Sequence, residues 1–162
     1  MEDQAQSTRW KGKVGVELKG PTADQIWPFL EDFCNIHQWF PNLDTCTQVE
    51  GVIGKPDLVR YCASKSDGSN ESEVKWVKEK LVMIDRIERC LSYEVTENNM
   101  GFKLYRATMK VLPVEEGSKI EMSFVADPVE GMEEEGLASY LDFCLNFMAK
   151  RMEQTLLSAS DA

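Results

Sequence analysis

The sequence predicts a single α+β domain in which a curved antiparallel sheet of about seven strands wraps around a long C-terminal helix. Apolar and polar residues alternate with a period of two along much of the chain up to Asp127, and after Pro128 the period changes to about 3.6. The 162 residues, 43% of them hydrophobic, suit one such domain. We therefore expect residues 10–158 to fold together, between a disordered tail at 1–9 and a short C-terminal tail at 159–162.

The N-terminal part of this domain predicts one strand followed by two short helices. Residues 10–18 alternate between an apolar row and a row that includes lysines, which is typical of a strand with one side facing solvent. A Gly-Pro-Thr turn follows, after which Thr22 or Asp24 can cap a short helix. A second short helix, around residues 35–40, is expected to end at Pro41, because a proline breaks a helix.

About six further strands are predicted between residues 45 and 127. They are separated by segments rich in glycine, proline, serine and asparagine, such as SKSDGSNES at 64–72 and ENNMG at 97–101. The alternation is clearest from Tyr105 to Val111 and from Lys119 to Ala126. Together these segments predict an antiparallel sheet with one apolar and one polar face.

The C-terminal segment predicts one long amphipathic helix. Its apolar positions recur at helical spacing from Leu137 to Met152, with three glutamates near its start and Lys150 and Arg151 near its end, which complements the helix dipole. The apolar face of the sheet must be covered, and only this helix is large enough to do so. Because the inward apolar surface exceeds what direct packing needs, we predict an internal cavity between sheet and helix.

Three polar side chains are predicted to point into this cavity. Glu79 lies in the strand VKWVKEKLVMID on the same face as Val77 and Leu81, so a carboxylate interrupts an apolar row. Arg60 lies on the preceding strand, where both faces carry apolar residues and the alternation is ambiguous. Tyr105 begins an inward row that is otherwise apolar. An arginine, a glutamate and a phenol are therefore expected to converge on one cavity.

Two interpretations of this group remain open at the level of sequence. Burying an unpaired charge costs on the order of several kcal/mol, so Arg60 and Glu79 can form a buried ion pair with a structural role. Alternatively, Arg60 holds an anionic ligand and Glu79 moves a proton. Apolar and aromatic residues are expected to line the same cavity, namely Trp39, Phe40, Val77, Leu81, Tyr93, Phe124, Phe143 and Phe147.

Charge and composition argue against several classes of partner. A net charge of -10 repels nucleic-acid phosphates and anionic lipid headgroups, and without a run of about 18 apolar residues we expect no stable membrane insertion. The five cysteines contain no CxxC pair, which fits neither a zinc site nor a disulfide framework and favours buried thiols in the cytoplasm. The single histidine, His37, is expected to pack or to face solvent rather than to catalyse.

The order and spacing of several short motifs resemble the plant lachrymatory-factor synthase family. That family belongs to the polyketide cyclase/dehydrase, START-like group, so the resemblance implies the helix-grip fold. It extends from about Trp10 to near the C-terminus. The matching motifs are RWKGKV at 9–14, DFCNIHQWFPNL at 32–43, VEG at 49–51, VRY at 59–61, KEKL at 78–81, LYRATM at 104–109 and VEGM at 129–132.

The resemblance also implies an activity and a set of catalytic residues. The synthase rearranges an unsaturated sulfenic acid to a thial S-oxide without a cofactor, and the residues implicated in it match Arg60, Glu79 and Tyr105 here. Arg60 would hold the substrate oxygen, Glu79 would move a proton between oxygen and carbon, and Tyr105 would orient the substrate or Glu79. The alternative is a carrier or sensor of a hydrophobic small acid or lipid, with Arg60 as the carboxylate anchor, because this scaffold also hosts binding proteins.

Overall fold

The computed structural model describes residues 9–64 and 74–160, and its elements follow the predicted order. β1 (Trp10–Lys19) is followed by α2 (Ala23–Glu31) and by the 3-10 helix η1 (Phe33–Gln38). Six more strands and one long helix complete the chain: β2 (Thr45–Glu50), β3 (Val59–Ser64), β4 (Lys75–Asp85), β5 (Cys90–Asn98), β6 (Tyr105–Val114), β7 (Gly117–Ala126) and α3 (Glu134–Ser160). The predicted α+β architecture is confirmed.

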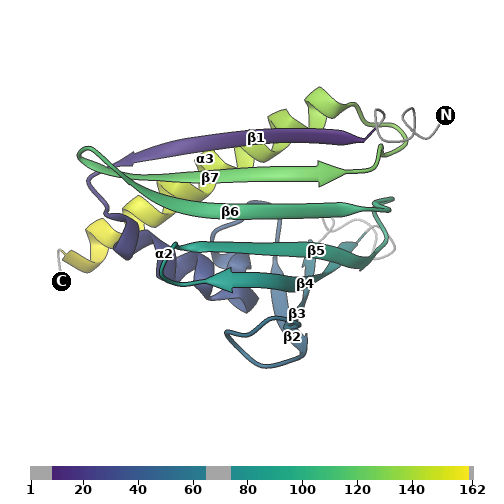
Figure 1. The fold of residues 1–162 in the computed structure, drawn as a ribbon, viewed down its shortest axis with the longest axis horizontal. Coiled ribbons are helices and arrows are strands. Elements are labelled where there is room, and N and C mark those ends of the chain that lie inside the picture. The colour runs from purple at the N-terminus through teal and green to yellow at the C-terminus, as the bar shows by residue number, and fades with distance from the viewer. Residues whose placement is uncertain (1–8, 65–73, 161–162) are drawn as a thin grey trace.

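The strands form one antiparallel sheet in the order β1-β7-β6-β5-β4-β3-β2. The two edge strands, β1 and β2, are therefore joined by the segment that contains α2 and η1. In Figure 1, α3 crosses one face of the sheet diagonally, and α2 and η1 lie on the same side of the sheet as α3. The described helices therefore all cover the same face of the sheet.

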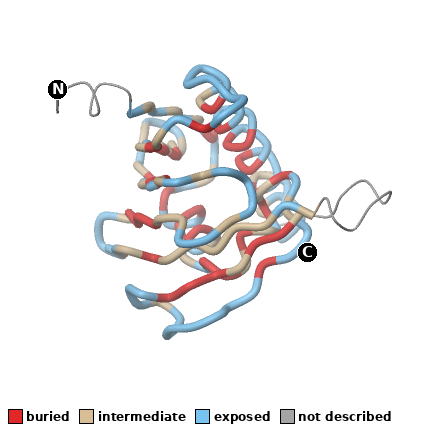
Figure 2. The backbone as a smooth tube through the Cα atoms, turned by 90° about the vertical axis from the view of Figure 1, so that its right-hand side faces the viewer, coloured by how far each residue is buried: buried red, intermediate tan, exposed pale blue. Residues whose placement is uncertain are grey.

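The core lies between the covered face of the sheet and the helices. Burial alternates along β6 and β7, as the alternation of apolar and polar residues predicted. Figure 2 shows buried residues on successive turns of α3 and interspersed with exposed positions along the strands. Among the described residues, no helix combines the length and the apolar character needed to cross a membrane.

The first helix begins as predicted, and the second is displaced. Thr22 caps α2 through a capping box, in which its hydroxyl accepts from the backbone N–H of Gln25 at 3.2 Å and its own N–H donates to the Gln25 side chain at 2.9 Å. The prediction of a helix at 35–40 is wrong by two residues, because the chain leaves α2 at Asp32 and enters η1 directly at Phe33.

Regular structure reaches close to both ends of the described chain. α3 continues to Ser160, and the domain bounds of 10–158 stay a prediction. At the other end, Arg9 is held by Asp127, with 3.1 Å between Nε and Oδ1. The rest of the predicted N-terminal tail lies outside the described residues, as does most of the polar turn at 64–72.

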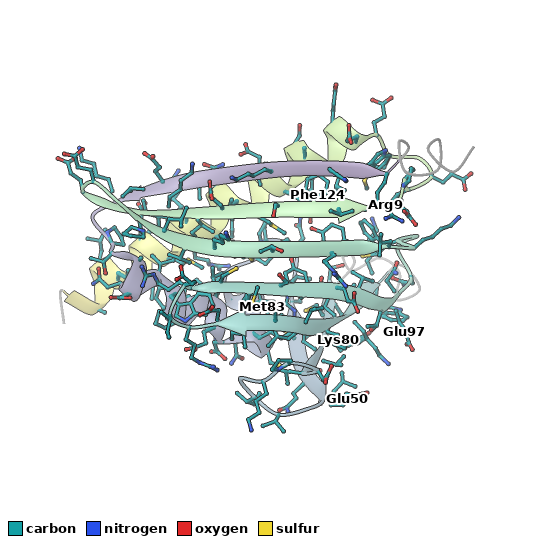
Figure 3. All side chains as sticks on the ribbon, in the orientation of Figure 1. Arg9, Glu50, Lys80, Met83, Glu97 and Phe124 are labelled. Atoms are coloured by element: carbon teal, nitrogen blue, oxygen red, sulfur yellow. The ribbon has the colours of Figure 1, made fainter. Side chains whose placement is uncertain are left out.

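A glycine in β1 makes room for an aromatic ring that points toward the core. Gly12 lies directly opposite Phe124 of β7, and a Cβ on Gly12 would come within 2.6 Å of the Phe124 ring. Figure 3 labels Phe124 beside β1. Its ring stacks on that of Tyr105, with 6.4 Å between centroids and 7° between planes. The absent side chain of Gly12 thus helps to set the position of Tyr105.

Gly12→Ala is expected to lower the free energy of unfolding by about 1–3 kcal/mol, because the added methyl group must displace the ring of Phe124. Gly15→Ala on the same strand is the matched control, since its Cβ would meet the flexible end of Lys119 at 3.0 Å. Urea unfolding followed by circular dichroism measures both variants. Equal losses for the two would contradict this account of Gly12.

Candidate functional site

A cavity of about 1120 Å³ lies between the sheet and α3. Its walls come from β3, β4, β5 and β6, from residues 40–44 after η1, from the β5–β6 connection and from the inner side of α3. The predicted internal cavity is therefore confirmed. Its volume is slightly above the range of about 300–1,000 Å³ that is common for pockets of small organic ligands, so it has room for one.

An ion pair between Arg60 and Glu79 lies in the wall of this cavity. The two residues are direct partners in the β3–β4 register, so their side chains leave the sheet on the same face. Arg60 Nε and Nη2 lie 2.8 Å and 2.7 Å from Oε1 of Glu79. Arg60 is only 4% exposed, and the Glu79 side chain is 12% exposed. The interpretation as a buried ion pair therefore describes their geometry, and their catalytic roles stay predictions.

Phe33 completes the surroundings of Arg60. Its backbone carbonyl accepts a hydrogen bond of 2.9 Å from Nη1, and its ring centroid lies 3.8 Å from the guanidinium carbon. The ring of Tyr93 lies 4.7 Å away. Burial lowers the pKa of Arg60, but Glu79 and the neighbouring thiols and phenol together raise it by more, so the side chain stays a cation. The sequence does not predict this contact of Phe33, because every residue type has a backbone carbonyl.

The two oxygens of Glu79 have different surroundings. Within the described part of the chain, the contacts of this carboxylate with Arg60 are both made through Oε1. Glu79 also lines the cavity. Oε1 is therefore engaged by Arg60, and three of the five N–H groups of Arg60 are already bonded.

Two tyrosines place neutral hydroxyl groups near this carboxylate. Tyr93 of β5 and Tyr105 of β6 are both buried, line the cavity and have ring centroids 6.5 Å apart. Burial raises the pKa of each phenol, and the negative charge of Glu79 raises both further. Both hydroxyls therefore keep their protons at neutral pH, and a hydrogen bond links the two to each other. The sequence predicted Tyr93 only as a wall residue.

The remaining residues predicted to line the cavity divide into two groups. Phe40 and Val77 are in its wall, whereas Trp39, Leu81 and Phe124 are buried in the surrounding core and are not part of the wall. The prediction for Phe143 and Phe147 is wrong, because these side chains are 58% and 38% exposed. They lie on the side of α3 turned away from its buried stripe. The helix contributes other residues to the wall: Leu137, Tyr140, Leu141 and Met148.

The described residues contain no cluster of side chains that could bind a metal ion. Across residues 9–64 and 74–160, no three histidine, cysteine, aspartate or glutamate side chains are grouped so as to hold a metal ion. His37 is half-buried in η1 and is not part of the cavity wall. The titratable groups that line the cavity are Arg60, Glu79, the thiol of Cys62 and three phenols, together with Asp44 and Lys75.

Comparison with known proteins identifies the family. Residues 9–153 match the family described as polyketide cyclase / dehydrase and lipid transport, and the chain belongs to this family. The protein XoxI from Bacillus cereus has a similar structure, with a TM-score of 0.73 and 22% identity over 93% of this chain and 98% of that one. Ginseng major latex-like protein 151 from Panax ginseng is also similar, with a TM-score of 0.69 and 18% identity over 91% and 97% of the two chains. At these identities the likenesses support the helix-grip fold alone.

Arg60→Met or Glu79→Leu alone is expected to lower the free energy of unfolding by about 3–5 kcal/mol, because each leaves a buried charge without its partner. The double variant should lose much less stability than the sum of the two single losses, which gives a large coupling energy in a double-mutant cycle. Chemical denaturation of the wild type, the two single variants and the double variant measures this coupling energy.

The pair formed by Glu94 and Arg106 is the matched control for this cycle. These residues are also direct partners across two strands and are 2.8 Å apart, but their side chains are 25% and 52% exposed. Solvent screening should limit their coupling energy to about 1 kcal/mol or less. Similar coupling energies for the two pairs would contradict the importance assigned to burial.

Proposed function

We propose that this member of the polyketide cyclase / dehydrase and lipid transport family binds a small, hydrophobic and weakly acidic molecule in its cavity and moves a proton within it, without a cofactor. Hydrophobic ligand binding is consistent with the family. The single observation that supports proton transfer is the position of Glu79, which lines a largely apolar cavity and is held by Arg60 through Oε1. A cytoplasmic location is part of the proposal, and its support is that all five cysteines are free.

In this proposal Arg60 positions Glu79 more than it holds the substrate. Its contacts with Oε1 and with the carbonyl of Phe33 fix both the guanidinium and the carboxylate. A general base needs such a fixed position within hydrogen-bond reach of the proton that it takes. Glu79 Oε2 would accept the proton, and the hydroxyls of Tyr93 and Tyr105 would orient the polar end of the substrate.

The resemblance to lachrymatory-factor synthases suggests an unsaturated sulfenic acid as the substrate. The O–H bond of the sulfenic acid would break as its proton passes to Glu79. A C–H bond would form when the same proton returns to the far carbon of the double bond, and the electrons move to give the thial S-oxide. No electron acceptor is needed, because the product is an isomer of the substrate. Proton transfer by a positioned side chain contributes about 10²–10⁴-fold to a rate.

A carrier without catalytic activity is the second candidate, and the closed ion pair favours it. Arg60 and Glu79 satisfy one another, so the cavity can hold a ligand without any chemistry. The compensated charge makes Arg60 a poor anchor for a carboxylate. A carrier of this kind would therefore select neutral molecules that have a hydrogen-bonding group.

We expect the protein to form thial S-oxide when it is mixed with an alliinase and an alkenyl cysteine sulfoxide. Glu79→Gln should abolish this product, and Tyr105→Phe should reduce it, because the first removes the proton carrier and the second a hydroxyl that orients the substrate. Glu97→Gln, at a glutamate with a 63% exposed side chain on the neighbouring strand, is the matched control and should keep the wild-type rate. Mass spectrometry of the products, with circular dichroism of each variant, makes the measurement.

Background levels of thial S-oxide from the wild type would exclude the isomerase and leave the carrier. Full activity in a folded Glu79→Gln variant would remove Glu79 as the proton carrier.

Neutral ligands are expected to bind the cavity more tightly than anions of the same shape. N-phenyl-1-naphthylamine should bind about tenfold or more tightly than its anionic relative 8-anilino-1-naphthalenesulfonate, because the charge of Arg60 is already compensated. Glu79→Gln should reduce the difference in affinity between the two dyes, because it leaves the positive charge of Arg60 uncompensated. Fluorescence titration, with each dye competing against the other, measures it. Tighter binding of the sulfonate by the wild type, lost in Arg60→Met, would instead identify Arg60 as an anion anchor.

A further inference from the structure

Two cysteines face each other across the outermost pair of strands. Cys46 of β2 and Cys62 of β3 are direct partners in the register, and their sulfur atoms lie 3.3 Å apart. Opposed residues of antiparallel strands have Cα atoms about 4.5–5.5 Å apart, which is within the range that a disulfide spans. Bond formation would need the sulfur atoms to approach from 3.3 Å to about 2.05 Å. Both thiols are free in the structure.

The strand that carries Cys46 contributes no other buried residue to the core. β2 is an edge strand, and Cys46 is its one buried residue, since the other five positions of the strand are exposed. The register between β2 and β3 also shifts between Gln48 and Glu50. Edge strands with few buried contacts open at a lower free energy than central ones. Such opening gives a small oxidant access from outside, and Cys62 also borders the cavity.

We propose that Cys46 and Cys62 form a redox-active dithiol, which a peroxide oxidises to a disulfide that fixes β2 to β3. In the first step the sulfur of Cys46 attacks one oxygen of the peroxide. The O–O bond breaks, the thiol proton leaves with the departing oxygen as water, and Cys46 becomes a sulfenic acid. The sulfur of Cys62 then attacks that of Cys46, the S–O bond breaks, and a second water leaves. Two thiols and one hydrogen peroxide thus give one disulfide and two waters.

The attacking role falls to Cys46, which lies on the edge strand and is 8% exposed, whereas Cys62 is 0% exposed. The thiol of Cys62 donates a hydrogen bond to its sulfur, which lowers the pKa of Cys46 against the opposing effect of burial, and the cation of Arg60 lowers it further. The thiolate is the reactive form of cysteine. By contrast, burial raises the pKa of Cys34 and of Cys144 to about 11 in each case.

The test is to treat the full chain with a small excess of hydrogen peroxide and to map its cysteines by mass spectrometry. Two of the five thiols should be lost, and digestion with trypsin and Asp-N should yield a peptide that links Cys46 to Cys62. Cleavage before Asp44 separates Cys46 from Cys34, so the two possible partners are distinguished. Closing a loop of about 16 residues should raise Tm by roughly 6–12 °C, and dithiothreitol should reverse the change.

Cys46→Ser should abolish the linked peptide, and Cys90→Ser is the matched control at a buried cysteine of β5, which should form it like the wild type. The mapping of the wild type decides the question even if a variant folds poorly. A disulfide that includes Cys34, oxidation to sulfinic acid without a cross-link, or retention of all five thiols would overturn the proposal.

Discussion

The pairing of Arg60 with Glu79 is the constraint on which the rest of this structure depends. Removing two charges from water is compensated only where the geometry is good and the remaining donors are bonded. The β3–β4 register supplies the geometry, and the carbonyl of Phe33 bonds a third N–H of the arginine. A slip of one residue between these strands would turn one of the two side chains to the opposite face of the sheet. The ion pair and the strand register therefore require each other.

The same pairing determines the chemical character of the cavity. A lone buried arginine would attract anions, but this one is paired with a carboxylate and contacts two aromatic rings. A net charge of -10 on the whole chain opposes the approach of anions as well. Near this pair the cavity offers the carboxylate of Glu79 and the phenols of Tyr93 and Tyr105, which keep their protons. Such a set suits a ligand that is neutral in water and has a proton to donate.

The sequence contains enough information for the fold and for the inward direction of the polar groups, but not for their contacts. The change of period after Pro128 predicts sheet and helix, and the position of Glu79 between Val77 and Leu81 predicts its inward direction. The hydrogen bond to Phe33 could not be predicted, since any residue type supplies a carbonyl. The prediction that Phe143 and Phe147 line the cavity was wrong because it relied on residue type, and aromatic residues are usually buried. Their angular position on the helix decides their exposure instead.

The alternation of apolar and polar residues is least clear in β3, because both faces of this strand are buried. Val59, Arg60, Cys62 and Ala63 are all buried, so both faces of the strand are apolar or enclosed, and a period of two cannot be read from its residues. On one face, Arg60 and Cys62 are two residues apart and so point the same way. Arg60 pairs with Glu79 on β4, and Cys62 faces Cys46 on the edge strand β2. Because β3 connects the ion pair to the thiol pair, any change that stiffens the β2–β3 contact also restrains the strand that positions Glu79 through Arg60.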